Sequence, residues 1–320
     1  MTAPTLVADI GGTNARFGLS VPSGGGRQVT DIQNFRAVDF ETVRDAADAY
    51  LESVGVRPIH ACFAVAGPVS SDEVTFTNSH WRLKVDETRS GMTLDTLQVI
   101  NDFHALAAGV THLPDDSFEV IRHGTGESFS PLLVIGPGTG LGQALVIPSD
   151  SRQIVVPTEG GHVAFAPRTE AEIEVMKFIA REHPRVSVER VLSGRGLVNI
   201  HRALCMMSNT PRASLQANEI TKAALTGEYP IAIEAVSMFC EILGSAVGDA
   251  VLASGARQGV VLGGGILPKV RDFFVTSAFV DRFLDKGRMR SYLDDVPIRL
   301  IMREGAALYG AAAVLEERLS

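Results

Sequence analysis

Two stretches of the chain share one alternation of apolar runs and small polar residues. Residues 6–21 read LVADIGGTNARFGLSV, an apolar run, a glycine turn with polar side chains and a second run that alternates back into apolar residues. Residues 132–147 read LLVIGPGTGLGQALVI and repeat this pattern. Apolar runs that flank a short glycine turn predict a β-hairpin. Each half of the chain is therefore expected to open with a hairpin.

Hydrophobic periodicity predicts an α/β chain around these hairpins. A strand at 28–36, a helix that follows 40–51 and an apolar strand at 59–66 would complete a β-β-β-α-β order. Further predicted elements are a strand at 73–78, a strand at 97–100 before a helix from 103, a turn-rich crossing at 114–130, helices at 170–182, 196–207, 231–252 and 305–315, and strands at 186–188 and 259–262. Strands that alternate with helices predict sheets covered by helices.

The tips of the two hairpins are suited to hold an anion. Their small residues are Gly11, Gly12 and Thr13 in the first, and Gly138, Thr139 and Gly140 in the second. Because glycine has no Cβ to shield its backbone N–H, successive amides can converge on an anion, and each threonine hydroxyl adds a donor. Neither tip has the P-loop lysine or the Rossmann glycine spacing. The alternative, a pair of ordinary tight turns, is less favoured for two matched tips than for one.

Two polar residues, Asn101 and Asp102, end a predicted strand where a helix begins. Open α/β sheets place their ligands at this end of a strand. The alternative is that one of the two residues caps the helix. Taken alone the cap is the stronger interpretation, whereas the two phosphate-like tips in the same chain favour a binding site.

Two later segments are also candidates for a site. Residues 157–162 read PTEGGH, and Glu159 and His162 in it can accept hydrogen bonds from hydroxyls, although solvated loop residues give the same pattern. A third glycine turn, which would let a ligand lie flat against the backbone, consists of Gly263, Gly264 and Gly265.

Composition narrows the class of protein. With 45% hydrophobic and 21% charged residues over 320 positions, the chain is typical of a soluble globular protein of about two domains. A net charge of −8 without a basic cluster argues against nucleic acid as a partner. The N-terminus lacks the basic segment of a signal peptide. The cysteines, Cys62, Cys205 and Cys240, are far apart, as is typical of reduced thiols in the cytoplasm.

Two further features, a His–Cys pair and a long apolar segment, are interpreted as parts of the protein core. His201 and Cys205 lie one helical turn apart, but no second pair is nearby, so a metal site is not favoured. The most hydrophobic long segment, 231–252, is interrupted by Glu234, Glu241 and Asp249 close to one edge of a helix. It is therefore expected to be a buried amphipathic helix rather than a membrane span.

The motifs resemble a known family when taken together. DIGGTNAR at 9–16 and GPGTGLG at 136–142 resemble the phosphate loops of the superfamily of sugar kinases, heat-shock chaperones and actin, and SVERVLSGRGL at 187–197 closely resembles bacterial ATP-dependent glucokinases. The glycine turns, Asn101-Asp102 and the EGGH loop follow that family's order over nearly the whole chain, which is identified as a member. The zinc motif of the related repressor and open-reading-frame kinases is absent, so no structural zinc is expected.

This resemblance implies a two-domain actin-like ATPase (ribonuclease H-like) fold with the active site in a cleft between the domains. The small α/β domain would comprise residues 1–110 plus 304–320, and the large one 111–303. The implied activity is transfer of phosphate from ATP, with Mg²⁺, to the 6-hydroxyl of glucose, the entry step of glycolysis. The expected partners are glucose and MgATP, with no nucleic acid and no membrane, and the expected form is a cytoplasmic homodimer.

The resemblance also implies roles for individual residues. Asp102 would be the catalytic base. The residues implied to bind sugar are Asn78, Asn101, Asp102, Glu159, His162 and Glu189. Those implied to bind nucleotide are Asp9, Gly11, Gly12, Thr13, Asn14, Arg16, Gly138, Thr139, Gly140, Gly263, Gly264 and Gly265, with Asp9 orienting Mg²⁺ through water. Without the resemblance, Glu189 would be read as a surface charge and Arg16 as an outward strand residue.

Other functions remain open at this stage. A kinase for another hexose or amino sugar fits the same motifs. A non-enzymatic ATP- or sugar-sensing module, as a regulator or a chaperone, is a second class, but no DNA-binding or peptide-binding segment is recognisable. The lone Trp81, three residues after Asn78, is expected to report closure on sugar binding unless it is buried in the first domain.

Overall fold

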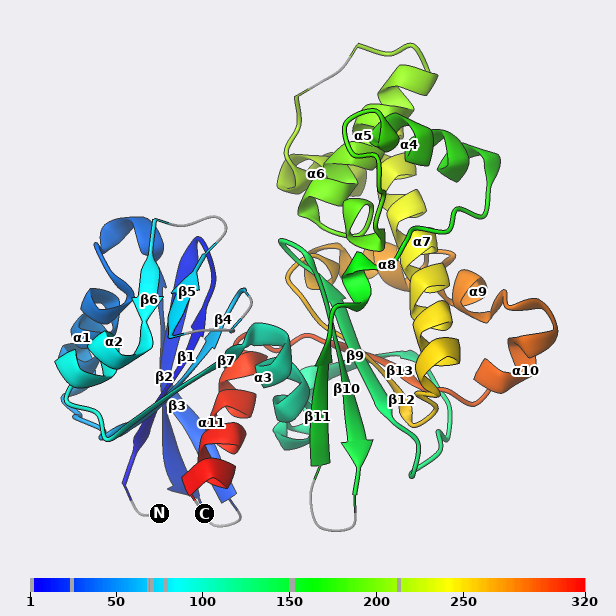
Figure 1. Ribbon diagram of the computed structural model, residues 1–320. Helices are drawn as coiled ribbons and strands as arrows, with labels where there is room; N and C mark the ends of the chain where they lie inside the picture. Colours follow the sequence, from blue (N-terminus) through cyan, green and yellow to red (C-terminus); the bar gives the residue numbers. More distant parts are fainter. Residues whose placement is uncertain are drawn as a thin grey trace. The chain divides into compact units, whose positions relative to one another are not determined.

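The computed structural model describes residues 3–23, 26–67, 69, 72–76, 80–149, 153–211 and 214–319. The chain forms two compact units, one of Met1–Ser117 with Arg303–Ser320 and one of Phe118–Met302 (Figure 1). We call them unit 1 and unit 2. Each contains a mixed β-sheet with helices packed against it.

Unit 1 is built on a sheet with the strand order β3-β2-β1-β4-β7. The strands of unit 1 are β1 (Thr5–Ile10), β2 (Asn14–Ser23), β3 (Gly26–Arg36), β4 (His60–Val65), β5 (Glu73–Thr75), β6 (Arg82–Lys84) and β7 (Thr96–Asn101). Its helices are α1 (Val43–Val54), α2 (Val85–Gly91), α3 (Asp102–Gly109) and α11 (Ala306–Leu319), with 3₁₀ turns η1 (Ala37–Asp39), η2 (Val110–His112) and η3 (Asp115–Ser117).

Helix α1 shows how local sequence determines an element of unit 1. Thr42 and Asp45 form a capping box, in which each side chain accepts from the other residue's backbone N–H, at 3.1 and 2.9 Å. The helix ends at Gly55, whose φ of 66° suits glycine. Its buried face brings Tyr50 onto Phe17 of β2, with ring centroids 5.6 Å apart. This aromatic pair anchors α1 to the sheet.

The C-terminal helix packs within unit 1 against α3 with backbone contact. A Cβ on Gly310 would overlap the carbonyl of Ala105, and a Cβ on Gly109 would overlap the backbone of Gly310. Because only glycine lets the two helices approach this closely, the small residues of the final segment place α11 beside α3 (Figure 1). The helix of small residues predicted at 305–315 is confirmed and runs on to Leu319.

Unit 2 is built on a sheet with the strand order β11-β10-β9-β12-β13-β8. Its strands are β8 (Phe118–Arg122), β9 (Leu132–Pro137), β10 (Leu141–Pro148), β11 (Gln153–Thr158), β12 (Gly259–Leu262) and β13 (Ile298–Ile301). Its helices are α4 (Glu170–Ala180), α5 (Gly194–Met207), α6 (Ala217–Thr226), α7 (Pro230–Ser254), α8 (Arg271–Val275), α9 (Phe279–Leu284) and α10 (Arg290–Leu293), with 3₁₀ turns η4 (Gly160–His162), η5 (Val188–Arg190), η6 (Leu267–Val270) and η7 (Gly287–Met289).

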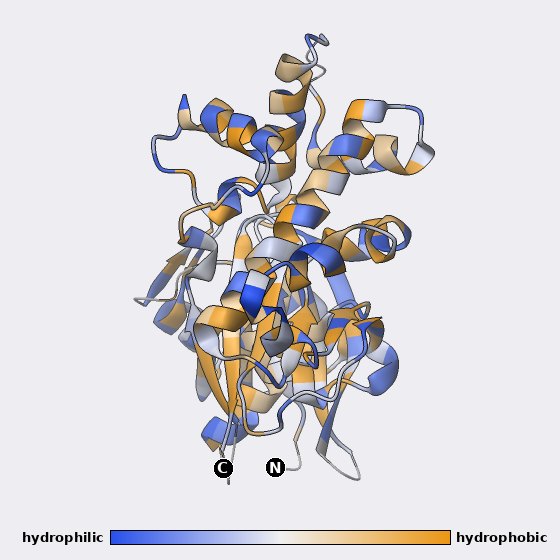
Figure 2. Cartoon of the chain, turned by 90° about the vertical axis from the view of Figure 1, so that its right-hand side faces the viewer, coloured by the Kyte–Doolittle hydropathy of each residue, from blue (hydrophilic) through white to orange (hydrophobic). Residues whose placement is uncertain are grey.

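The two sheets share one topology. In each, three antiparallel strands (β1–β3 or β9–β11) are followed by two strands parallel to the first, β4 and β7 in unit 1 and β12 and β13 in unit 2. In unit 2, β8 adds an antiparallel edge to β13. Hydrophobic residues run along the strands, whereas the helices carry both kinds of residue (Figure 2). The predicted pair of hairpins and the β-β-β-α-β order are confirmed.

Helix α7 is the central helix of the unit 2 core. By length and composition alone it is long enough to cross a membrane, but 67% of its most apolar stretch is buried inside the structure. Its buried residues join the hydrophobic core of unit 2. Pro230 begins the helix and Gly255, with a φ of 66°, ends it. The prediction of a buried helix is confirmed.

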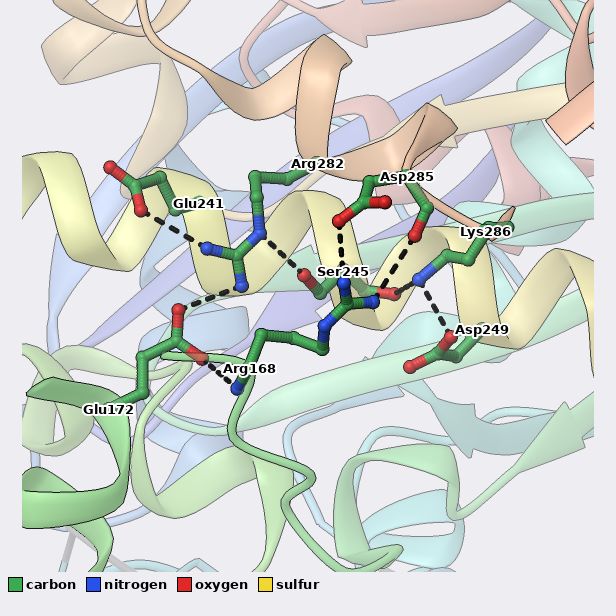
Figure 3. Close-up of polar contacts among 8 residues, drawn as sticks. All are labelled: Arg168, Glu172, Glu241, Ser245, Asp249, Arg282, Asp285 and Lys286. Atoms are coloured by element: carbon green, nitrogen blue, oxygen red, sulfur yellow. Dashed lines mark hydrogen bonds and ion pairs between the residues drawn. The ribbon is translucent and has the colours of Figure 1, made fainter. Parts of the chain in front are cut away.

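A network of charged side chains ties α4, α7 and α9 together in unit 2 (Figure 3). Arg282 of α9 donates to Glu172 Oε1 of α4 at 2.7 Å, to Glu241 of α7 at 3.2 Å and to Ser245 Oγ at 3.1 Å. The side chains of Glu172 and Arg282 are 1% and 13% exposed. Lys286 extends the network to Asp249 and Ser245, and Arg168 pairs with Asp285. The network therefore joins three helices around one buried ion pair, Glu172 with Arg282, and its outer members Asp249, Arg168 and Asp285 are exposed.

Three sequence predictions of secondary structure need correction. The strand predicted at 186–188 is wrong, since these residues contribute one isolated bridge, Ala164 with Ser187, and the start of η5. The crossing predicted at 114–130 contains η3 and β8, because its apolar residues pair with β13. The strand predicted at 73–78 ends at Thr75 as β5 and pairs with β6, and residues 77 and 78 lie outside the described residues.

Candidate active site

The first glycine hairpin of unit 1 is held at both ends and open at its tip. The ladder of β1 and β2 closes at Ile10 and Ala15, and Gly11 N–H donates to Asn14 C=O at 2.9 Å. The carbonyl of Thr13 accepts from Ala37 N–H at 2.8 Å. The side chains of Thr13 and Asn14 are exposed. The turn therefore presents small and polar residues to an incoming ligand.

Two charged residues lie directly below this tip. Asp9 of β1 and Arg16 of β2 are opposite each other in the ladder. Burial raises the pKa of Asp9, and the charge of Arg16 opposes that rise. Arg16 donates to Asn34 Oδ1 at 2.7 Å and to Glu304 Oε2 at 2.9 Å, with its side chain 23% exposed. The guanidinium of Arg16 is therefore held by two partners within unit 1.

Asn101 ends β7 and caps helix α3. Its Oδ1 accepts from the amides of Phe103 at 2.9 Å and His104 at 3.2 Å, and its Nδ2 donates to Gly67 C=O at 3.2 Å. The capping interpretation therefore holds for Asn101, which leaves one N–H of the amide for a ligand.

Asp102, the first residue of α3, has an unusual carboxyl group. Its Oδ1 accepts from Phe103 N–H at 2.9 Å. Burial, and next the negative charge of Asp9, raise the pKa of Asp102 to about 7. Such a carboxyl can take or hold a proton near neutral pH. The pKa of Asp102 thus depends on the charge of Asp9 within unit 1.

The second glycine hairpin, in unit 2, is held by the start of α5. Gly138 N–H donates to Gly140 C=O at 2.8 Å, and Gly194 N–H donates to Gly138 C=O at 2.9 Å. Thr139 is exposed, and a Cβ on Gly138 would meet no atom within 4 Å. Ser193 caps α5 through Gly196 N–H at 3.0 Å. The tip thus lies at the N-terminal end of a helix, where the dipole favours anions.

Leu141, which follows the tip, brings the predicted sugar residues of unit 2 together. Its amide donates to Glu189 Oε2 at 2.9 Å. On its other side, a Cβ on Gly161 would overlap the carbonyl of Leu141, so the EGGH loop packs directly on β10. Glu159 and His162 in that loop are exposed, with Oε2 and Nε2 3.7 Å apart. Both side chains are free to accept hydrogen bonds from a hydroxylated ligand.

The third glycine turn combines a packing role with an open surface. Gly264 has a φ of 84°, and a Cβ there would overlap Pro137 C=O. A Cβ on Gly136 would likewise overlap Gly263 C=O. A Cβ on Gly265, by contrast, would meet no atom within 4 Å. Gly264 is therefore required by the backbone, whereas Gly265 leaves space for a ligand.

Two candidates of the sequence analysis, Asn78 and Trp81, do not contribute to this site in the structure as described. Asn78 lies outside the described residues. Trp81 is 1% exposed in the core of unit 1, where its Nε1 donates to Phe40 C=O at 3.0 Å. The expectation that it reports ligand closure is therefore not supported, and the buried alternative holds.

Two residues that sequence analysis overlooked position the EGGH loop. A Cβ on Gly160 would overlap the side-chain amide of Gln143, and Arg185 donates to His162 C=O at 2.8 Å. Both contacts join residues far apart in sequence, and although Gln143 lies in the second hairpin stretch, the pattern gave it no role. No signal in the sequence alone would have found them.

Comparison with known proteins places this arrangement in a class. The crystal structure of a glucokinase from an Antarctic psychrotroph superposes with a TM-score of 0.87 at 37% identity, covering 99% of this chain and 100% of that chain. The fold defines a sugar kinase of the actin-like ATPase type.

Sequence comparison gives the family. The glucokinase family model matches residues 6–318. The glucokinase of Chromobacterium violaceum is 41% identical over 318 residues, covering 99% of this chain and 90% of that protein, and the glucokinase of Helicobacter pylori is 42% identical over 329 residues, covering 99% and 97%. The chain belongs to the glucokinase family.

Proposed function

We propose that the protein transfers the γ-phosphoryl group of ATP to the 6-hydroxyl of glucose, forming glucose 6-phosphate and ADP as the entry step of glycolysis. Family membership supports the reaction class. The observation in the structure that carries the proposal is Asp102, a carboxyl at a strand end whose pKa is raised to about 7. A carboxylate of this basicity accepts the hydroxyl proton as the oxygen attacks phosphorus.

The other residues then divide by unit. In unit 1, Asn101 donates its free N–H to a sugar hydroxyl, and Asn78 is retained as a sugar ligand by resemblance alone. In unit 2, Glu159, His162 and Glu189 accept from the remaining hydroxyls. A site whose polar groups need those hydroxyls rejects sugars that lack them. These hydrogen bonds would decide which sugar is accepted.

Phosphate binding falls to the glycine turns. The tips at Gly11–Asn14 and Gly138–Gly140 offer backbone amides and threonine hydroxyls, and the adenosine lies along Gly263–Gly265. Arg16 offsets phosphate charge by leaving its ion pair with Glu304, whose side chain is 82% exposed, and pairing with a phosphate oxygen instead. A carboxylate so exposed returns to water at small cost, since exposed ion pairs contribute at most about 1 kcal/mol.

The acidic pair of unit 1 suits a magnesium ion. The negative charge of Asp9 raises the pKa of Asp102, and burial raises the pKa of both carboxyls, so a divalent cation beside them would favour their ionised forms. Mg²⁺ binds proteins through one or two carboxylates plus substrate phosphates, so the lack of any cluster of three or more acidic, His or Cys groups in the described part of the chain is no obstacle. The ion would neutralise phosphate charge, with Asp9 orienting it directly or through water.

The first prediction tests the function itself. Pure protein with MgATP is expected to release ADP when glucose is added, measured by a coupled assay across a panel of hexoses and amino sugars. Glucose lacking the 6-hydroxyl should give no ADP above background, because the acceptor atom is missing. Sugars that lack another hydroxyl should react slower, by as much as ~10⁴ in kcat/KM. Faster turnover of another sugar would reassign the substrate, and no sugar-dependent ADP would refute the proposal.

The second prediction concerns pH. Because the base must be ionised, kcat/KM for glucose is expected to fall as pH drops through the pKa of Asp102. In the metal-free protein that pKa is about 7, and a nearby cation would lower it. Asp9→Asn removes a negative charge near Asp102. The fall of kcat/KM on the acid side, its acid limb, should therefore move to lower pH, whatever the effect of the substitution on the maximal rate. The assay spans about pH 5 to pH 9. A wild-type kcat/KM that stays constant down to the acid end of this range, or an unshifted limb in Asp9→Asn, would contradict this assignment.

The assembly and location belong to the same proposal. We expect a homodimer in the cytoplasm, with glucose and MgATP as its partners. The buried position of α7 fits a soluble protein. Size-exclusion chromatography with light scattering would measure the assembly directly.

A further inference from the structure

The carboxylate of Glu189 has two oxygens, of which the protein uses one. Oε2 accepts a hydrogen bond from the amide of Leu141 at 2.9 Å. Leu141 is the first residue of β10 and follows the glycine tip. Among the described residues, Oε1 has no hydrogen bond or ion pair. A carboxylate that accepts from a backbone N–H makes a stronger hydrogen bond than a neutral group does. Oε2 therefore holds the base of the tip while Oε1 stays available.

Two further contacts make the same segment a support for the tip. A Cβ on Gly140 would overlap Glu189 Oε2, so the carboxylate lies directly against the tip. The hydroxyl of Ser193 donates to Glu189 C=O at 2.9 Å, and Gly194 N–H donates to Gly138 C=O at 2.9 Å. The segment thus contacts the tip at its start, its end and its base.

We infer that Glu189 is a positioning residue for the phosphate-binding tip as well as a sugar ligand, so that sugar and nucleotide binding to unit 2 are coupled through one carboxylate. The inference rests on the proposed function for the identity of the two ligands. A sugar hydroxyl on Oε1 orders the side chain that fixes Leu141. Because coupling between two binding sites is reciprocal, nucleotide at the tip should strengthen sugar binding by the same factor.

Binding isotherms with glucose alone, with the Mg²⁺ complex of the non-hydrolysable analogue AMPPNP alone, and with both together test the coupling. Glu189→Ala is expected to weaken AMPPNP binding in the absence of sugar by about tenfold, since it leaves the Leu141 amide unpaired and the tip unsupported. Glu189→Gln keeps a carbonyl oxygen for that amide. It should restore AMPPNP binding to within about threefold of wild type while glucose binding stays weak, because the charge is lost.

A second variant reaches the same contact from the opposite side. Gly140→Ala pushes the carboxylate off Leu141 without changing its chemistry, and should weaken glucose binding although the new methyl group belongs to the phosphate tip. Glu182→Ala, an exposed glutamate in the segment before Glu189, is the matched control and should leave both isotherms unchanged. Thermal unfolding of each variant verifies that it is folded.

Several outcomes overturn the inference. The inference is overturned if folded Glu189→Ala binds AMPPNP within twofold of wild type. It is also overturned if Glu189→Ala and Glu189→Gln lose the same AMPPNP affinity. If Glu189→Ala does not fold, the test rests on Glu189→Gln and Gly140→Ala. Glucose binding by Gly140→Ala at wild-type affinity then overturns the coupling. All readouts are binding constants. A wild-type protein that binds both ligands but forms no glucose 6-phosphate would refute the proposed function and leave this test intact.

Discussion

Replacing Asp102 by asparagine is expected to lower kcat by about 10²–10⁴, the usual contribution of a positioned general base. The substitution keeps the shape of the side chain, and an amide oxygen can still accept from Phe103 N–H, as Oδ1 does now at 2.9 Å. What is lost is the carboxylate whose pKa burial and Asp9 raise to about 7. Glucose affinity should stay within a few-fold of wild type, so that the loss falls on kcat and not on binding.

The measurement is steady-state kinetics with MgATP, together with calorimetric titration of glucose into the variant. Asp95→Asn is the matched control, because Asp95 is exposed on the same unit just before β7. It should leave kcat unchanged. Turnover of Asp102→Asn within about threefold of wild type would show that another group takes the proton.

Replacing Arg282 by methionine is expected to destabilise the protein by about 3–5 kcal/mol, the usual cost of removing one partner from a buried ion pair. Arg282 is the partner of Glu172, whose side chain is 1% exposed and which also accepts from Arg168 N–H at 2.6 Å. Without the guanidinium this carboxylate remains buried and uncompensated among α4, α7 and α9 (Figure 3). The change should appear as a lower denaturant midpoint of unfolding at neutral pH.

Two controls separate the buried charge from loss of packing. The double variant Arg282→Met with Glu172→Met should recover most of the loss, because a buried ion pair replaced by apolar groups of similar volume is often neutral. Arg36→Met removes an arginine from an exposed pair with Asp39, 69% and 46% exposed, and should cost less than about 1 kcal/mol. Equal losses at the two arginines would argue against a special role for burial.

The secondary structure of the site region was predictable because it depends on local pattern. The glycine hairpins, the strand that ends at Asn101 and the helix that begins at Asp102 follow from apolar periodicity and turn residues. Where the periodic pattern covered only a few residues, it predicted the wrong structure. Residues 186–188 read VSV and resemble a strand, but their backbone contributes one isolated bridge, Ala164 with Ser187, before η5 begins. Three residues without a neighbouring strand do not make a ladder.

The sequence by itself determined the two glycine hairpins, the buried helix α7 and the set of chemical groups available, since each depends on the order of apolar, small and polar residues along the chain. Only the tertiary structure decided how those groups are used. Burial and Asp9 set the pKa of Asp102, Asn101 uses its oxygen to cap α3, and the amide of Leu141 takes one oxygen of Glu189. The reason is physical: desolvation, charge proximity and hydrogen-bond pairing depend on distances between atoms that are remote in sequence, and no local pattern encodes those distances.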